Sequence, residues 1–182
     1  MTEISLHIMD LVQNSIRAKA SFIDIEVSES LQKNKLYIQI TDNGIGMSAD
    51  VLKKASDPFF TSRTTRKVGL GISLYKQLVE QCNGTVTLTS HEGEGTKLSS
   101  AMDLNNIDRQ PMGDISGVLV LLIAANTGIQ FRYSHTTEKG QYVLDTKEIK
   151  NTLGDTPVND PGVMKFIKEM IHENLQEINI QS

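Results

Sequence analysis

Two neighbouring stretches of the chain, residues 23–27 and 36–40, carry apolar side chains at every second position. Because successive side chains of a strand point to opposite faces of a sheet, this period of two predicts two half-buried strands. The polar residues 33–35 between them have the composition of a turn. The pattern therefore predicts a β-hairpin whose second strand leads directly into Asp42.

Three longer stretches repeat apolar residues at the spacing of a helix, at about 3–19, 70–82 and 161–178. The second is followed by Asn83-Gly84, residues that commonly end a helix. The third begins at Asp160-Pro161, an N-cap followed by a proline in the first turn. These end signals agree with the apolar spacing, so three amphipathic helices are predicted.

Shorter elements are predicted between and after these helices. The glycine-containing residues 92–95 indicate the turn of a second hairpin, and the composition changes near Asn105. We therefore expect a larger unit at residues 1–105 and a smaller α+β appendage at 106–182, whose role the sequence does not show. The shorter elements are helices at 49–55, 114–125 and 146–153 and strands at 85–90, 96–102, 130–134 and 141–145.

The composition limits the classes of function. The 182 residues carry a formal net charge of −4, and basic side chains cluster only around 63–67, so we expect no nucleic-acid partner. The single cysteine, Cys82, excludes an intramolecular disulfide and favours a reducing compartment. The chain starts without the blocks of a signal peptide, and its longest apolar run, 118–125, is far shorter than the roughly 20 residues that span a bilayer. We expect a cytoplasmic protein without membrane association.

The segment that follows the second strand, Asp42-Asn43-Gly44-Ile45-Gly46-Met47, suits an adenine site. A carboxylate at a strand end accepts a hydrogen bond from the 6-amino group of adenine, whereas guanine presents an oxygen there. Gly44 and Gly46 allow the backbone to turn tightly and to approach a base. When this segment is considered alone, a plain Asp-Asn-Gly turn is the alternative interpretation.

The first predicted helix brings polar residues to one face. His7, Asp10, Asn14 and Arg17 follow one another at spacings of three and four. The neutral oxygen of Asn14 suits a Mg²⁺ ion that is held mainly by phosphates. An amphipathic surface helix with its polar residues in solvent is the alternative interpretation, and it leaves His7 without a specific role.

A further segment suits phosphate. Gly69 and Gly71 open a helix, where backbone N–H groups and the positive end of the helix dipole attract anions. The preceding loop at 58–68 is polar and basic, and Arg63 and Lys67 are its candidate phosphate contacts. A solvated basic loop is the competing interpretation.

These motifs, taken with Gly93-Glu94-Gly95-Thr96 and in this order, resemble the ATP-binding fold of the GHKL superfamily of histidine kinases, gyrase-type ATPases and MutL. The resemblance covers about residues 3–104. It implies an α/β fold of the Bergerat type, a two-layer α+β sandwich in which a mixed β-sheet carries helices on one face. It also implies a site for ATP and Mg²⁺ with Asn14 as the Mg²⁺ ligand. The implied contacts are Asn14, Arg17, Asp42, Gly44, Gly46, Met47, Thr61, Arg63, Lys67, Gly69, Leu70, Gly71 and Thr96.

Asp10 is the candidate catalytic residue that the resemblance implies. It precedes Asn14 by four residues, where the ATPase branch carries a catalytic glutamate. A carboxylate there orients water or a protein hydroxyl for attack on the γ-phosphate. Because aspartate is one methylene shorter than glutamate, an action through the surroundings of Mg²⁺ stays open.

The chain also departs from the family. We expect no dimerising helical hairpin with a phosphoacceptor histidine before the first helix, and we expect no transducer domain of the gyrase-like ATPases. His172-Glu173 lies on an amphipathic helix and is expected to face solvent. The overall pattern is closest to stand-alone bacterial ATP-binding proteins. We expect an ATPase or a kinase of a partner protein, with an ATP-gated, non-catalytic binding module as the alternative, and a homodimer is possible in either case.

Overall fold

A six-stranded mixed sheet with the strand order β3-β4-β2-β1-β5-β6 organises the protein. The structure is a computed structural model that describes residues 2–56 and 70–178. Neighbouring strands are antiparallel except β1 and β5, which run parallel. The strands are β1 (Phe22–Ser30), β2 (Lys35–Asp42), β3 (Thr85–His91), β4 (Gly95–Asp103), β5 (Gln130–Thr137) and β6 (Gly140–Asp145).

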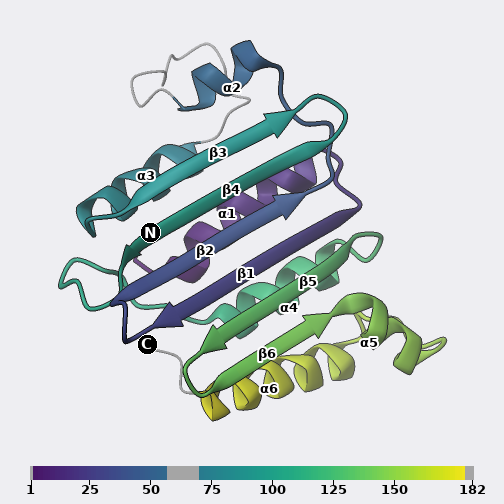
Figure 1. Cartoon of the computed structure of the whole chain (residues 1–182). Helices are drawn as coiled ribbons and strands as arrows, with labels where there is room; N and C mark the ends of the chain where they lie inside the picture. Colours follow the sequence, from purple (N-terminus) through teal and green to yellow (C-terminus); the bar gives the residue numbers. More distant parts are fainter. Residues whose placement is uncertain (1, 57–69, 179–182) are drawn as a thin grey trace.

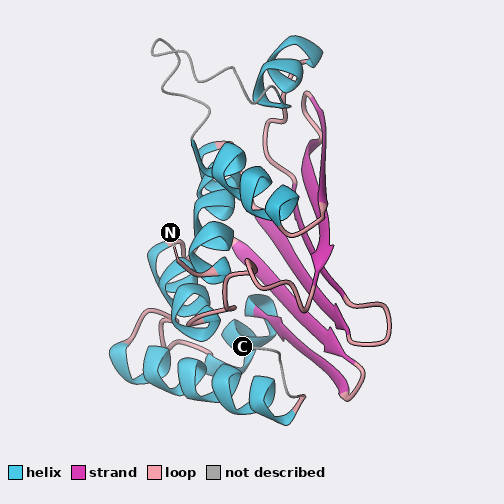
Figure 2. Cartoon of the chain, turned by 90° about the vertical axis from the view of Figure 1, so that its left-hand side faces the viewer, coloured by secondary structure: helices cyan, strands magenta, loops and turns pink. Residues whose placement is uncertain are grey.

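The long helices cover one face of this sheet and leave the other face open (Figures 1 and 2). This is the two-layer arrangement that the sequence predicts, and it is confirmed. Within the described residues, none of the helices has both the length and the apolar character needed to cross a membrane. The helices are α1 (Ile4–Arg17), α2 (Ala49–Ser56), α3 (Leu70–Gln81), α4 (Ile115–Ala125), α5 (Thr146–Leu153) and α6 (Pro161–Glu177).

Alternation along the central strands decides which face of the sheet is buried. The odd-numbered residues of β1 from 23 to 27 and the even-numbered residues of β2 from 36 to 40 are apolar and buried, and Ile25 lies opposite Ile40. The intervening residues point to the open face, where the Gln39 amide donates to the Glu26 carboxylate at 2.9 Å. A shift of one residue in register would expose the whole apolar set, so the alternation fixes the pairing.

Side chains and backbone turns fix the helix ends where the sequence predicts them. The carboxylates of Asp145 and Asp160 accept hydrogen bonds from backbone N–H groups in the first turns of α5 and α6. After α3, Asn83 adopts a φ of 54° and the Gly84 N–H donates to the Val79 carbonyl at 2.8 Å. These groups satisfy backbone atoms that a helix end leaves unpaired.

Residues beyond 105 extend the same sheet. Strand β5 pairs in parallel with β1, and Tyr133 lies opposite Ile25. Helix α4 packs against both α1 and α6, which buries most of its apolar side chains, whereas Leu121 is exposed. The sheet therefore crosses the predicted boundary between 105 and 106, while the division into two units remains a prediction.

The start of α1 is held by the segment that leads to α4. The Ile4 N–H donates to the Pro111 carbonyl and the Ser5 N–H to the Met112 carbonyl, both at 2.9 Å. These bonds satisfy two N–H groups in the first turn of the helix. Helix α1 is thus fixed at its N-terminal end by residues from the second half of the chain.

A buried polar trio joins β1 to β5. His135 donates or accepts at both ring nitrogens, with Nε2 at 2.7 Å from Glu29 Oε1 and Nδ1 at 2.7 Å from the Tyr133 hydroxyl. All three side chains are buried on the helix-covered face. Burial raises the pKa of Tyr133 well above its usual value, and the nearby Glu29 adds to this effect. The trio is a buried polar contact between two neighbouring strands.

Candidate functional site

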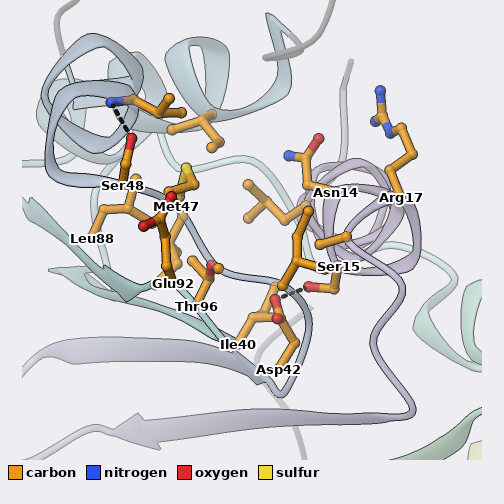
Figure 3. Close-up of a pocket in the computed structure, with 17 residues that line it drawn as sticks. Asn14, Ser15, Arg17, Ile40, Asp42, Met47, Ser48, Leu88, Glu92 and Thr96 are labelled. Atoms are coloured by element: carbon orange, nitrogen blue, oxygen red, sulfur yellow. Dashed lines mark hydrogen bonds between the residues drawn. The ribbon is translucent and has the colours of Figure 1, made fainter. Parts of the chain in front are cut away.

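A cavity of about 640 Å³ lies between the C-terminal half of α1, the turn after β2, and strands β3 and β4 (Figure 3). This volume falls in the range of small-molecule sites, which is about 300–1,000 Å³. Most of the lining is apolar and includes Leu11, Ile40, Leu88 and Leu98. A flat aromatic group fits such walls, provided that the polar atoms at one end match it.

Helix α1 forms one wall through residues that share a face. Leu11, Asn14, Ser15 and Ala18 stand at positions i, i+3, i+4 and i+7 of the helix, and all line the cavity together with Arg17. Asn14 and Arg17 lie at the end of the cavity that is remote from Asp42 (Figure 3). The Arg17 Nε donates to the Gln13 carbonyl at 3.0 Å. Of the polar residues predicted for one face of this helix, Asn14 and Arg17 thus line the cavity.

Asp42 lies at the opposite end, on the last residue of β2, and is 8% exposed. Its Oδ2 accepts a hydrogen bond from the Ser15 hydroxyl at 2.5 Å, and its Oδ1 accepts one from the Gly44 N–H at 2.9 Å. Each carboxylate oxygen has two lone pairs, so within the described part of the chain each keeps one acceptor position. The carboxylate is held in one orientation and retains the capacity to bind a donor.

The turn after Asp42 is clamped on both sides, which explains its two glycines. A Cβ on Gly44 would lie 2.7 Å from the Ala18 carbonyl oxygen, and one on Gly46 would overlap the His91 carbonyl oxygen. Gly46 also adopts a φ of 67°, which L-residues rarely tolerate. Any side chain here would push the turn away from α1 or from β3.

Thr96 lies beside Asp42 because β4 pairs with β2, with these two residues opposite each other. Its hydroxyl lies 2.8 Å from Ser90 Oγ, which also donates to the Gly95 carbonyl at 2.9 Å. The Met47 N–H donates to Ser90 Oγ at 2.8 Å. Ser90 therefore connects the glycine turn to Thr96 at the floor of the cavity.

Asp10 lies outside the lining that the described residues form. It sits one turn before Asn14 and contacts the start of α3, where a Cβ on Gly71 would lie 3.5 Å from Asp10 Oδ2. Leu70 begins α3, and nothing more is described of its side chain. Thr61, Arg63, Lys67 and Gly69 lie outside the described residues, so their predicted contacts remain predictions.

His7 packs within the fold and does not line the cavity. Its Nε2 lies 3.2 Å from Gln110 Oε1, and its ring lies against Tyr75 with 5.7 Å between ring centres. Burial lowers the pKa of His7, and the contact with Gln110 opposes this shift. His7 is therefore a buried packing residue, which neither the predicted phosphate face nor a solvent-exposed helix face describes. His172 is exposed, as expected.

Sequence reasoning missed Ser15, Ser90 and Glu92, which belong to the cavity or its supporting bonds. Ser15 follows Asn14 on the same helix, so its helical position was the available signal. Ser90 gives no local signal because its partners come from the 42–47 turn and β4. Glu92 lies in the β3–β4 turn and lines the cavity, although the turn pattern alone assigns it no contact.

A family model described as histidine kinase-, DNA gyrase B-, and HSP90-like ATPase matches residues 2–106. This range contains Asp10, Asn14, Asp42 and Thr96, and it also contains strands β1 to β4. The residues that line the cavity all lie within the range that this family model matches.

Curated relatives match the same region. Sensor histidine kinase ZraS of Escherichia coli O157:H7 is 31% identical over 106 residues, which is 58% of this chain and 23% of the relative. Sensor protein DegM of Bacillus sp. (strain B21-2) is 34% identical over 91 residues, which is 50% of this chain and 24% of the relative. The match therefore spans about a quarter of the length of these relatives.

Among solved structures, the MutL ATPase domain of Aquifex aeolicus complexed with ADP has a similar fold. The TM-score is 0.50 with 11% sequence identity, and the match covers 93% of this chain and 88% of that domain. At this identity the similarity concerns the fold alone. It includes residues beyond 106, in contrast to the family model.

Proposed function

The chain belongs to the family of histidine kinase-, DNA gyrase B- and HSP90-like ATPases, and from this premise we propose that it binds ATP with Mg²⁺ and transfers the γ-phosphate to water or to a partner protein. One observation carries the proposal. A single cavity has the fixed Asp42 carboxylate at one end and Asn14 with Arg17 at the other. This distribution of polar groups suits a base at one end and phosphates at the other.

The base end favours adenine. Asp42 keeps acceptor positions that the 6-amino group of adenine satisfies, and the apolar walls accommodate the ring. Guanine would place its 6-oxygen against the carboxylate, and an unpaired acceptor of this kind costs about 1–3 kcal/mol. The MutL ATPase domain with the similar fold is complexed with ADP, an adenine nucleotide, which agrees with this choice of base.

The phosphate end suits Mg²⁺ that is carried by the nucleotide. Within the described residues the Asn14 side-chain amide makes no hydrogen bond, so its oxygen is available as a ligand. Mg²⁺ in such sites takes one or two protein oxygens and keeps phosphate oxygens and water for the rest. When bound, the ion would neutralise charge that develops on the phosphates. Arg17 adds a positive charge at the same end.

Asp10 is proposed to orient the attacking group. It lies beside the N-terminal turn of α3, where backbone N–H groups favour phosphate oxygens. A carboxylate at this place would accept the proton of water or of a protein hydroxyl as the oxygen attacks phosphorus in line with the leaving diphosphate. Cations of the 57–69 segment, Arg63 and Lys67, are proposed to stabilise the charge. Action of Asp10 on a water molecule bound to Mg²⁺ is the alternative role.

A second candidate function is a non-catalytic, ATP-gated binding module. One observation favours it: α1 forms the cavity wall with its C-terminal half, and its N-terminal end is bonded to residues 111 and 112. Nucleotide binding would then be coupled, through helix α1, to the position of the segment that contains residues 111 and 112. A protein partner that contacts this segment would respond to the nucleotide without any turnover.

Isothermal titration with ATP and GTP in the presence of Mg²⁺ tests the binding proposal. The parent is expected to bind ATP, and Asp42→Ala is expected to lose binding. Asp103→Ala is the matched control, because Asp103 also ends a strand but pairs with Lys35 away from the cavity. Absence of ATP binding in the parent would refute the proposal.

Phosphate release by the same samples separates the two functions. An enzyme would show release that Asp10→Ala abolishes while ATP affinity is kept. A binding module would show negligible release in the parent and ATP-dependent capture of its partner. Stable phosphate on protein, followed with γ-labelled ATP, would distinguish a kinase from an ATPase.

A further inference from the structure

The hydroxyl of Ser90 has a defined hydrogen-bond direction. A serine hydroxyl has one proton to donate and two lone pairs to accept with. The Ser90 proton goes to the Gly95 carbonyl at 2.9 Å, because a carbonyl has no proton of its own. One lone pair accepts the Met47 N–H at 2.8 Å. The remaining contact, 2.8 Å to Thr96 Oγ1, must therefore use the proton of Thr96.

This direction decides what Thr96 offers to the cavity. With its proton committed to Ser90, the Thr96 hydroxyl presents only lone pairs to a ligand. Thr96 lines the cavity next to Asp42, its partner across β2 and β4. A freely rotating threonine would bind donors and acceptors equally well, whereas this one accepts only.

The Ser15 hydroxyl, on helix α1, also has its proton committed to a neighbour. Its proton goes to Asp42 Oδ2 at 2.5 Å, while the Gly44 N–H occupies one lone pair of Oδ1. Ser15 and Asp42 are 4% and 8% exposed, so water does not compete freely for these bonds. Ser15 thereby fixes the carboxylate and has no proton left for a ligand.

We propose that Ser15 and Ser90 are positioning residues that leave the Asp42 and Thr96 side chains at the base end of the cavity as acceptors only, and that they set its selectivity for 6-amino over 6-oxo purine nucleotides. The inference rests on the proposed function and assigns part of its base selectivity to two residues that need not touch the nucleotide. A 6-amino group donates to this end of the cavity. Among the described side chains at this end, a 6-oxo group finds no hydroxyl donor unless one of the two committed protons is released.

The test measures the ratio of the dissociation constants of ITP and ATP, because hypoxanthine differs from adenine at the 6-position and in the proton at N1. Titrations with Mg²⁺ use the parent, Ser15→Ala and Ser90→Ala. The parent is expected to prefer ATP at least about tenfold. Ser90→Ala frees the Thr96 proton for a 6-oxygen, and Ser15→Ala releases the Asp42 carboxylate. Each is expected to lower the ratio about fivefold or more.

Two serines away from the cavity are matched controls. Ser5 lies on α1 and donates to Glu3, and Ser100 lies on β4 and bonds to Tyr75 and to the Ile38 carbonyl. Both are buried, so Ser5→Ala and Ser100→Ala remove comparable hydroxyls. They are expected to leave the ratio within about twofold of the parent. Ser90→Thr keeps the hydroxyl and is expected to restore the ratio.

The outcomes separate the inference from the proposed function. A parent that binds neither ATP nor ITP refutes the proposed function itself. A parent that binds ATP, with an unchanged ratio in both cavity variants, refutes only the role of the hydroxyls. Equal changes in the control variants would also refute it, because the effect would then be structural. If one cavity variant does not fold, as judged by circular dichroism, the other decides.

Discussion

Asp10 and Gly71 are in contact where helices α1 and α3 meet, and this contact depends on the absence of a side chain at Gly71. A Cβ at this position would lie 3.2 Å from Asp10 Cβ and 3.5 Å from Asp10 Oδ2. The first distance is shorter than an ordinary van der Waals contact, so a methyl group would displace the aspartate or the helix. The glycine therefore allows the candidate catalytic carboxylate to approach the N-terminal turn of α3.

Gly71→Ala is expected to impair turnover more than stability. Alanine favours a helix over glycine by about 1 kcal/mol, and crowding costs about 1–3 kcal/mol, so the net loss of stability should be small. A displaced Asp10 should slow phosphate release at least about tenfold, since small misplacements of reacting groups are costly. Urea unfolding and phosphate release check both parts. Gly128→Ala, where a Cβ meets nothing within 4 Å, is the control, and equal kinetics in the two variants would contradict the role of Asp10.

Asn14→Ala is expected to abolish the effect of Mg²⁺ on ATP affinity. In the parent, removal of Mg²⁺ with EDTA should weaken ATP binding about tenfold, because the ion links the phosphates to Asn14. In the variant the affinities with and without Mg²⁺ should converge. Gln13→Ala changes the neighbouring residue on α1 and should retain the full Mg²⁺ effect. Titration calorimetry checks this, and a variant that still responds to Mg²⁺ would exclude Asn14 as the ligand.

Glu29→Ala is expected to lower the free energy of unfolding by about 1–3 kcal/mol. It leaves the buried His135 without its carboxylate partner, and unpaired buried polar groups cost this much. Glu26→Ala, on the open face of the same strand, should cost less than about 0.5 kcal/mol. Urea denaturation compares the two. Similar losses in both variants would mean that the trio does not stabilise the pairing of β1 with β5.

Asp114→Ala is expected to lower the free energy of unfolding by about 1 kcal/mol at pH 7, because Asp114 caps α4. Its hydrogen bond with Lys168 and the N–H of Gly117 lower the pKa of Asp114 to about 2. A carboxyl whose pKa is lower in the folded state stabilises the fold above its unfolded pKa, about 3.9, and loses this effect as the pH falls through the folded value. The difference between parent and variant in the free energy of unfolding should therefore be constant above about pH 5 and should disappear between about pH 4 and 2.

Urea unfolding at a series of pH values tests the Asp114 prediction. Asp155→Ala is the control, because Asp155 is exposed and caps no helix among the described residues. That variant should match the parent within about 0.5 kcal/mol at every pH. A difference between parent and Asp114→Ala that does not change with pH would show that packing, and not the ionised cap, is responsible.

Local patterns predicted the elements because local forces decide them. Alternation at 23–27 and the cap at Asp160 each depend on neighbours within a few residues, and both appear in the structure. The order of the motifs also placed Asp42 and Asn14 in one site, and the cavity contains both. The roles of these residues and the contacts of the 57–69 segment remain predictions.

The missed features depend on contacts between distant parts of the chain. Ser15 and Asp42 are 27 residues apart, and no pattern in the helix or in the strand indicates their hydrogen bond. His135 carried no motif, because Glu29 lies 106 residues away and joins it only when β5 aligns with β1. Sequence periodicity reports which side of an element is buried, but it does not report which polar groups meet there.

The parallel pairing of β1 with β5 also sets the order in which the sheet is completed. The two strands are separated by about 100 residues, whereas β1 and β2 are joined by a short turn. At a synthesis rate of about 5–20 residues per second, roughly 5–20 s pass between the synthesis of β1 and that of β5, its second neighbour in the sheet. During that interval its outer edge has unpaired N–H and C=O groups that attract other strands. The nascent chain therefore exposes this strand edge after the cavity residues have been made and before β5 has emerged.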